Sequence, residues 1–392
     1  MPRRLKIALI AACPFPAPRG TPIRALRTAQ ALAELGHTVD VVTYHLGDSS
    51  ALPQTDGLSV HRIPAVGFYK KVSPGPSFSK LAILDLLLVR EALKVGKRQK
   101  PDLVYVHHYE GLLIGLAIRR RLNCPVVYDA HTTLEAELSS YFSKTWQPVA
   151  RRIGSRMDTE LPKRADHTVA VTEAIATRLR PYLAQKSGLS VISNGVEIGH
   201  FTKARWAPNS NDKRTRNVIF TGNMAPYQGV ELLLEAFASL RRRRSDVRLR
   251  IVTNDDFGRY RATARKLNLV AEIDVVSSRF ESLPDELAGA DVAVNPRVVG
   301  PGIPQKLLNY MAVGMPIVSF DGIVRGLSEN EIGLLVPDGD VEAFATAIDR
   351  LLDDRELALE LGGLARQAVT SMGDWRTTGS RLEQVFFDVL AR

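Results

Sequence analysis

Short apolar runs alternate with stretches of helical periodicity along the whole chain, and no other feature of the sequence restricts the possible folds as strongly. The runs that we interpret as strands are Lys6–Ala12, Val39–Tyr44, Leu103–His107, Val126–Asp129, His167–Val171 and Ser190–Ile192, then Val218–Thr221, Arg248–Thr253, Ile273–Val276, Val292–Asn295, Pro316–Phe320 and Gly333–Val336. Runs that lack polar alternation indicate strands buried on both faces, as in parallel sheets covered by helices. The sequence therefore predicts an α/β fold with doubly wound parallel sheets.

The pattern of strands and helices begins again near Asn194-Gly195-Val196, which divides the chain into two halves of similar length. We expect residues 1–190 to form one Rossmann-like domain, residues 191–372 to form a second, and residues 373–392 to form a C-terminal helix. Residues 201–216 are polar and poor in helix formers, and we interpret them as a linker. Ligands of such folds bind outside the carboxyl ends of the strands, so two facing domains predict a site in the cleft between them.

Positive charge is concentrated in the first half of the chain. The 392 residues carry a formal charge of +10, but residues 1–190 hold 27 Lys and Arg against 15 Asp and Glu, while the remainder carries −2. A basic domain of this kind suits an anionic membrane surface or an anionic substrate. Nucleic acid is not expected as a partner, because the chain has neither an aromatic and basic RNA-binding signature nor zinc-finger spacing.

The number of cysteines and the length of the apolar runs indicate the cellular compartment in which the chain is expected. The chain has two cysteines and no uncharged apolar stretch of about 18 residues, so we expect neither a disulfide framework nor a membrane span. Ile10-Ala11-Ala12-Cys13 resembles the end of a lipoprotein signal, but Lys6 leaves the apolar stretch too short, which favours a buried strand. The expected location is cytoplasmic, and the basic first half is compatible with peripheral contact at the cytoplasmic face of a membrane.

Common cofactor and metal motifs are absent from the sequence. No strand is followed by G-x-G-x-x-G, and the chain contains no P-loop, H-E-x-x-H or C-x-x-C pattern, so ordinary dinucleotide and P-loop sites are not expected. Asp338-Gly339-Asp340 follows an apolar run and opens a helix, so we interpret it as a turn with a helix N-cap. The chemistry is then expected from side chains and free amides at the ends of strands and helices.

Three places combine reactive or cationic side chains with the end of a predicted strand. Gly20 stands between the first strand and a helix, where free N–H groups attract anions. His131 follows the strand that contains Asp129, where an imidazole can hydrogen-bond a substrate or move a proton. Arg297 follows another strand and Lys306 opens the next helix, so two cations and free amides point to a bound diphosphate.

Taken in order, several longer stretches resemble the family 4 retaining glycosyltransferases, which have the two-domain GT-B fold. The resemblance covers essentially the whole chain and rests on Pro14–Gly20, Gly36–Val39, Val126–His131, Ala165–Glu173, Val191–Glu197, Phe220–Asn223 with Gln228-Gly229, Ala290–Pro296, Lys306–Val318 and Gly333–Asp340. Trp375 before the last helix also fits, since in the family that helix crosses back onto the first domain. The order and spacing of these stretches carry the resemblance.

The resemblance implies transfer of a hexosyl-type sugar from a nucleoside-diphosphate donor, with retention of anomeric configuration and with neither a cofactor nor a required metal. The second domain would bind the nucleotide-sugar, and the first would bind the acceptor, for which lipid-linked or cell-envelope glycans are candidates. The implied catalytic group is His131, Arg297 and Lys306, with Asp129 and Thr172 as acceptor contacts. The implied donor-binding residues are Gly20, Gly222, Asn223, Gln228, Arg279, Phe280, Gly302, Ile303, Leu307, Leu308 and Asn309.

The chain departs from the family pattern at four positions that would contact the donor. The glutamates of the E-x7-E motif would align on Pro301 and Asn309, and the Arg and Lys of the G-R…K-G segment are replaced by Asn223 and Gln228. Asn309 keeps the capacity to hydrogen-bond ribose. Two phosphate-binding cations are missing, and we hypothesise that Arg297 and the lysine that opens the following helix replace them.

Two other functions remain open at this point. One is a phosphorylase or sugar-nucleotide epimerase on the same fold, which the loss of two cations leaves room for. The other is a non-catalytic partner subunit, which the missing glutamates motivate. The segment Lys80–Lys100, with its leucines and basic residues, either lies on a membrane or forms a buried helix, and we favour the buried helix. The oligomeric state is unknown.

Overall fold

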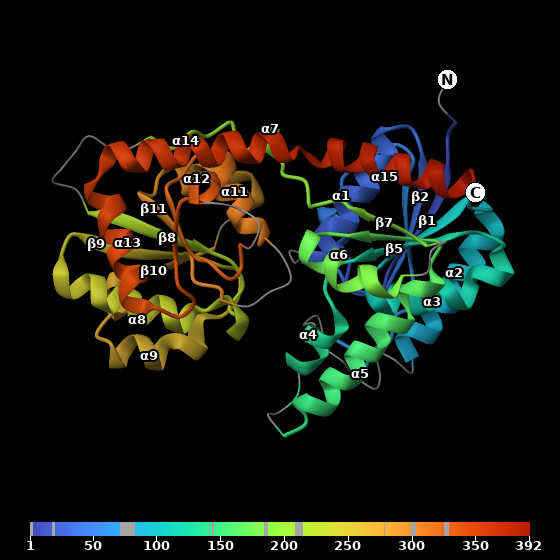
Figure 1. The fold of residues 1–392 in the computed structure, drawn as a ribbon, viewed down its shortest axis with the longest axis horizontal. Coiled ribbons are helices and arrows are strands. Elements are labelled where there is room, and N and C mark those ends of the chain that lie inside the picture. The colour runs from blue at the N-terminus through green and yellow to red at the C-terminus, as the bar shows by residue number, and fades with distance from the viewer. Residues whose placement is uncertain are drawn as a thin grey trace. The chain divides into compact units, whose positions relative to one another are not determined.

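The computed structural model describes residues 3–17, 20–70, 83–140, 142, 145–183, 187–207, 215–277, 279–298, 303–324 and 329–392. The chain divides into two compact units (Figure 1). Unit 1 comprises Met1–Gly195 and Trp375–Arg392, and unit 2 comprises Val196–Asp374. The boundaries expected from the sequence fall after residues 190 and 372, so the expected and observed divisions differ by a few residues.

Unit 1 is built on a seven-stranded parallel sheet with the order β3-β2-β1-β4-β5-β6-β7. The strands are β1 (Lys6–Ala11), β2 (Thr38–Thr43), β3 (Leu58–Arg62), β4 (Leu103–His107), β5 (Val126–Ala130), β6 (His167–Ala170) and β7 (Gly188–Val191). The chain first winds outward from β1 to β3 and then returns to β4. In doubly wound sheets this reversal between β1 and β4 marks where ligands bind, at the carboxyl ends of the strands.

Two hydrophobic cores lie on the two faces of this sheet, because successive strand residues point to opposite sides. The helices are α1 (Gly20–Glu34), α2 (Asp85–Gln99), α3 (His108–Leu122), α4 (Leu134–Ser140), α5 (Gln147–Glu160), α6 (Glu173–Leu179) and α15 (Trp375–Leu390). Helices α1 and α15 cover one face, where Leu9 and Tyr105 meet Leu32 and Phe386. Helices α2, α3 and α6 cover the other, which explains the lack of polar alternation in the central strands.

Unit 2 is built on a six-stranded parallel sheet with the order β10-β9-β8-β11-β12-β13. Its strands are β8 (Arg216–Thr221), β9 (Val247–Val252), β10 (Ile273–Val276), β11 (Val292–Asn295), β12 (Ile317–Phe320) and β13 (Leu334–Val336). Its helices are α7 (Ile198–Phe201), α8 (Val230–Arg243), α9 (Arg261–Lys266), α10 (Leu283–Ala288), α11 (Gln305–Val313), α12 (Glu329–Ile332), α13 (Val341–Asp353) and α14 (Arg355–Met372). The sheet order reverses between β8 and β11, so the expected ligand position is at their carboxyl ends.

Two features of the fold differ from the sequence predictions. The predicted linker at 201–216 is wrong for its described part, since Phe201 and Trp206 are buried and the Trp206 indole donates to the Ala290 carbonyl at 2.8 Å. The strand β3 is not predicted from the sequence, because it lies at the sheet edge with half-buried and polar residues. Edge strands lack the continuous apolar pattern that reveals the central ones.

Several local predictions are confirmed. Lys6–Ala11 forms a central buried strand, and Asp340 caps α13 by accepting the Ala343 amide at 2.9 Å. Leu84 and Leu88 are buried, so the described part of Lys80–Lys100 packs as a domain helix, although residues 80–82 lie outside the described ranges. In the part of the chain that the structure describes, no helix has the length and apolar character that a membrane span requires.

Candidate functional site

In unit 2, Lys306 lies in the first turn of α11, and its ammonium is buried next to the carboxyl end of β8. The Lys306 Nζ donates a hydrogen bond to the Gln228 Oε1 at 2.7 Å and lies 3.9 Å from the centroid of the Phe220 ring. Only 9% of Lys306 is exposed. Gly222 follows β8 with φ at +148°, and a Cβ there would lie 3.0 Å from the Lys306 Nζ. The missing side chain therefore leaves room for the ammonium where the strand ends.

The loop that contains Gln228 is a hydrogen-bonded unit. The Asn223 side chain donates to the Tyr227 hydroxyl at 2.9 Å and accepts from the Gln228 Nε2 at 3.3 Å. Gly229 has φ at +73°, and a Cβ there would lie 1.9 Å from the carbonyl oxygen of Pro296. The loop backbone is therefore packed directly against the end of β11, at a position that only glycine can occupy. Asn223 and Gln228 thus hold the loop that supports Lys306.

Electrostatics at Lys306 favour a bound anion. Burial lowers the pKa of Lys306 far below its ordinary value, and the nearby Arg297 charge lowers it further. The Arg297 guanidinium lies over the Tyr227 ring, 4.9 Å from its centroid, and burial lowers the pKa of Arg297 as well. No ion pair joins Lys306 to a carboxylate within the described ranges. Two desolvated cations of this kind gain most from the oxygens of a phosphate group.

The other predicted donor-binding residues in α11 and just before it differ in their burial. Leu307 and Leu308 are buried in the core of unit 2, so their side chains are not available to a ligand. Ile303 and Asn309 are half-buried, before the helix and within it. Gly302 lies outside the described residues.

Phe280 is positioned by an aromatic contact that the sequence analysis does not predict. Its ring stacks on the imidazole of His200, with centroids 4.4 Å apart and an interplanar angle of 16°. The His200 Nε2 also lies 2.9 Å from the carbonyl oxygen of Phe280. Arg279 precedes this residue at the start of the same short turn. The Phe280 ring is 40% exposed, so one part of it remains open to a ligand.

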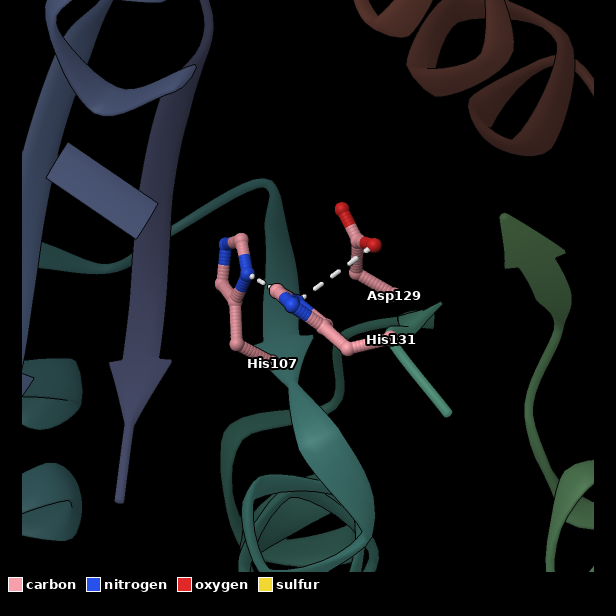
Figure 2. A group of neighbouring side chains, drawn as sticks. All are labelled: His107, Asp129 and His131. Atoms are coloured by element: carbon pink, nitrogen blue, oxygen red, sulfur yellow. Dashed lines mark hydrogen bonds and ion pairs between the residues drawn. The ribbon is translucent and has the colours of Figure 1, made fainter. Parts of the chain in front are cut away.

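In unit 1, two histidines and a carboxylate gather at the carboxyl ends of β4 and β5 (Figure 2). His107 ends β4, Asp129 lies in β5, and His131 follows that strand. The His107 Nδ1 and the His131 Nε2 are 2.9 Å apart, and the His131 Nε2 lies 3.6 Å from the Asp129 Oδ1. The His131 side chain is 10% exposed, whereas His107 and Asp129 have no exposed surface. His131 is therefore the member of this group that can reach a substrate.

Asp129 is enclosed by hydrogen-bond donors. The Arg24 Nε lies 3.1 and 3.0 Å from the two carboxylate oxygens, and the Tyr105 hydroxyl also donates to one of them. Arg24 in turn donates to the Asn194 Oδ1 at 3.0 Å and to the Ile192 carbonyl at 2.9 Å. The predicted acceptor contact through Asp129 is therefore replaced by a supporting role, because this carboxylate faces Arg24 and not solvent.

The pKa values of both histidines of this group lie below the ordinary value of an imidazole, which favours the neutral rings. Burial lowers the pKa of His107 to about 4, against the opposing effect of Asp129. Burial, followed by His107 and Arg24, lowers the pKa of His131 well below its ordinary value. Two neutral imidazoles can share one N–H, so the 2.9 Å contact fixes the His131 ring whichever nitrogen carries the proton.

His107, Asp129 and His131 are close enough together to share a metal ion, since their ligand atoms lie within 4.8 Å of one another. The donor chemistry argues against it. Both Asp129 oxygens accept hydrogen bonds from Arg24, and that guanidinium would repel a divalent cation. The two imidazole nitrogens already contact each other. This group therefore fits a hydrogen-bonded scaffold for His131 better than a metal centre.

His108, the next residue after β4, is held in an unusual backbone conformation with φ at +66°. Its Nε2 lies 2.8 Å from a Glu137 oxygen and its Nδ1 lies 3.3 Å from a Glu110 oxygen. Burial opposes the charged ring, but Glu137 and Glu110 outweigh it and raise the pKa of His108 to about 10. This imidazolium ties the start of α3 to α4, beside His131.

The remaining predicted residues of unit 1 lie at helix starts. Gly20 is exposed and begins α1, and nothing lies within 4 Å of a Cβ built on it, so a ligand can approach this backbone. Thr172 caps α6 by accepting the Ile175 amide at 3.3 Å, which is a structural task.

Sequence reasoning missed Arg24, Tyr105, His107 and Tyr227. Arg24 carries no clear signal, because its neighbours three and four residues on are Arg27 and Thr28 and its partner Asp129 is distant in the sequence. His107 ends a predicted strand next to the strand of His131, which also places it at the ligand edge of the sheet. Tyr105 carries no such signal, since its partner Asp129 is distant in the sequence, and the contact of Tyr227 with Arg297 also joins distant residues.

The chain matches two protein-family models. The model described as "Glycosyltransferase Family 4" matches residues 18–200, and the model described as "Glycosyl transferases group 1" matches residues 215–354. Among curated proteins, the D-inositol 3-phosphate glycosyltransferase of Corynebacterium glutamicum is 27% identical, over 95% of this chain and 92% of that protein. The protein of the same description from Pseudarthrobacter chlorophenolicus is also 27% identical, over 91% and 87%.

Solved structures share the fold of the whole chain. Sucrose-phosphate synthase from Thermosynechococcus elongatus has a TM-score of 0.82 at 21% identity, covering 99% of this chain and all of that one. HepE from Anabaena, solved with UDP and glucose, has a TM-score of 0.75 at 18% identity, covering 98% and 100%. At these identities the similarity shows the GT-B fold.

Proposed function

The chain belongs to glycosyltransferase family 4, and from this premise we propose that it moves a hexosyl-type sugar from a nucleoside-diphosphate donor to an acceptor with retention of anomeric configuration. The observation that supports the donor class is the buried Lys306 ammonium beside Arg297, at the start of α11. Release of a diphosphate needs its developing negative charge stabilised, and preorganised cations with free helix amides provide this.

We assign the donor contacts in unit 2 as follows. Lys306, Arg297 and the first amides of α11 bind the diphosphate, and Asn309 binds the ribose. The exposed side of Phe280 meets the base. Leu307 contributes through its backbone only, because its side chain is in the core.

In unit 1, we assign His131 to the transferred sugar and Gly20 to the donor phosphates. Asp129 positions His131 and Arg24 and does not act as a nucleophile, because both of its oxygens are taken by buried donors. Retention then requires attack from the face of the leaving group. The sugar–phosphate bond breaks, the acceptor oxygen forms the new bond, and its proton passes to the released diphosphate. No metal takes part in this scheme.

The experiment that tests this proposal is a transfer assay with UDP-, GDP-, ADP- and dTDP-sugars and a panel of glycan and lipid-linked acceptors. We expect one donor to release its nucleoside diphosphate, with the anomeric coupling of the product in ¹H NMR equal to that of the donor. Addition of EDTA should leave the rate unchanged. An inverted product, or loss of activity in EDTA that Mg²⁺ restores, would contradict the proposal.

The same assay separates the two other functions. Phosphate-dependent release of a sugar phosphate would identify a phosphorylase, and conversion of the donor into its stereoisomer would identify an epimerase. Donor binding without transfer or hydrolysis would identify a partner subunit, for which the absent E-x7-E glutamates are the motivation.

Replacing His131 tests its assignment. His131→Ala should lower kcat about 10- to 100-fold, the usual effect of losing a hydrogen bond or proton relay at the reacting group. Because burial lowers the pKa of His131 well below its ordinary value, any inflection that His131 gives to the pH profile of kcat/KM should lie below that of a free imidazole and disappear in His131→Ala. His167→Gln, at the amino end of β6, is the control and should keep wild-type kcat. Unchanged kcat in His131→Ala would remove this residue from the site.

We propose a peripheral position at an anionic membrane as part of this function, since the positive charge is concentrated in residues 1–190 and lipid-linked glycans are candidate acceptors.

A further inference from the structure

Helix α5 of unit 1 exposes an unusual row of apolar side chains. Trp146, Val149 and Ile153 are 61%, 49% and 50% exposed, and their spacing of three and four residues places them on one side of the helix. Phe142, just before the helix, is 42% exposed. We call Trp146, Val149 and Ile153 together the α5 face. Single exposed apolar residues are ordinary, but a row of this kind marks a surface that contacts something.

A neighbouring side of α5 is buried and fixes the orientation of the helix. Ala150, Gly154 and Asp158 are buried, and a Cβ on Gly154 would lie 2.6 Å from the Glu135 backbone at the start of α4. Asp158 accepts the Leu134 and Glu135 amides at 2.8 and 2.9 Å. Helices α4 and α5 therefore pack as a pair (Figure 1), and this packing holds the α5 face outward.

Two arginines lie beside the α5 face, because Arg152 and Arg156 each follow Val149 and Ile153 by three residues. With Arg151, Glu135, Gln147 and Thr159 they line a shallow groove, in which Arg151 lies about half a helical turn away from the α5 face. Within the described residues, none of the three arginines is within ion-pair distance of a carboxylate. Other surface cations of unit 1 do have acid partners, such as Lys163 with Glu160 and Arg178 with Glu135.

We propose that the α5 face docks on the surface of an anionic lipid bilayer, with Trp146, Val149 and Ile153 inserted among the headgroups and acyl ends and with Arg152 and Arg156 on lipid phosphates. An apolar row beside unpaired cations is the pattern of helices that lie in a membrane interface. Tryptophan is the side chain that favours the headgroup level. This inference specifies the peripheral-membrane part of the proposed function and makes no use of the donor site.

Helix α2 is the competing surface in unit 1. It exposes Leu86 at 67%, next to Arg90, Lys94 and Lys97. Its other apolar residues on that side are half-buried, and it offers no aromatic side chain. The apolar area and the tryptophan favour α5, and Leu86 supplies a matched control.

Trp146 gives a direct readout, because the two other tryptophans, Trp206 and Trp375, are 6% and 7% exposed. We expect vesicles of 40% phosphatidylglycerol in phosphatidylcholine to shift the emission of the full-length protein to the blue. Lipids brominated near the headgroup should quench it, and 0.5 M NaCl should weaken the effect. Trp146→Phe should abolish the blue shift while cosedimentation with the vesicles remains.

Variants locate the surface by cosedimentation. At about a factor of five per basic residue near an anionic surface, Arg152→Gln/Arg156→Gln should lower the partition constant about 25-fold. Val149→Ser/Ile153→Ser should lower it tenfold or more, and Leu86→Ser should leave it unchanged. All variants should keep the nucleotide-dependent thermal shift of the wild type, which separates loss of docking from loss of the donor site.

Three results would overturn the inference. The first is a wild-type protein that does not bind anionic vesicles. The second is release by Leu86→Ser with retained binding of both α5 variants, which would place the contact on α2. The third is a concentration-dependent dimer without lipid that the Val149→Ser/Ile153→Ser change abolishes, which would identify a second copy as the occupant.

Discussion

Lys306→Met is expected to lower kcat/KM for the donor about 30- to 1000-fold. Losing one preorganised charge-stabilising group at a leaving oxyanion costs about 2–4 kcal/mol of transition-state stabilisation. Arg297→Gln should have an effect of similar size, because the two cations share the region next to Gln228 and Tyr227. Steady-state kinetics with the donor identified in the transfer assay measures both.

The stability of the same variant separates a catalytic from a structural role. Methionine keeps the apolar stem against Phe220 and removes a buried charge, so Lys306→Met should unfold at or above the wild-type temperature. Lys266→Met, on the exposed side of α9, is the matched control and should change neither quantity. Wild-type kcat/KM in both Lys306→Met and Arg297→Gln would show that these cations do not replace the missing ones.

Arg24→Leu is expected to lower the free energy of unfolding by about 3–5 kcal/mol, the usual cost of leaving one partner of a buried ion pair alone. Arg24 and Asp129 are 1% and 0% exposed, and Arg24 also holds Asn194 and the Ile192 carbonyl. The substitution leaves the Asp129 carboxylate buried, with the Tyr105 hydroxyl as its remaining hydrogen-bond donor. Urea unfolding followed by circular dichroism measures the loss, in the transition that reports unit 1.

A second substitution checks the reason for this loss. Arg24→Leu with Asp129→Leu removes both charges and should recover part of the stability, because replacing a buried pair is far less costly than breaking it. Arg27→Leu, one turn along the same helix and half-buried, should cost less than about 1 kcal/mol. A loss in Arg24→Leu no larger than that in Arg27→Leu would contradict the structural role of the pair.

Most strands and their order along the sequence could be predicted because central parallel strands are apolar on both faces. Leu103–His107 and Val292–Asn295 are predicted with the bounds that the structure has. The edge strand Leu58–Arg62 escapes this pattern, since one side of it has no neighbouring strand. Trp206 lies in a polar stretch, and only its contact with Ala290, distant in sequence, shows that it is part of unit 2.

The two cations of the candidate site could be predicted from the sequence, but the residues that hold them in place could not. The spacing of Arg297 and Lys306 around one loop indicates an anion site, but the burial of Lys306 on Phe220 depends on the sheet order. For Asp129, the position in the sequence does not show the role of the side chain. Its position at a strand end predicts contact with a ligand, and only the tertiary contact with Arg24 shows that its oxygens are occupied.

The central claim is that unit 2 binds a nucleoside diphosphate through Lys306, and a thermal-shift comparison of wild type and Lys306→Met with UDP, GDP, ADP and dTDP tests it most directly. A ligand at 100 times its Kd stabilises the native state by about 2.7 kcal/mol, which corresponds to a shift of several degrees in Tm. The account predicts that one nucleotide raises the Tm of the wild type and that Lys306→Met loses most of this shift. No shift with any nucleotide, or an equal shift in both proteins, would contradict it.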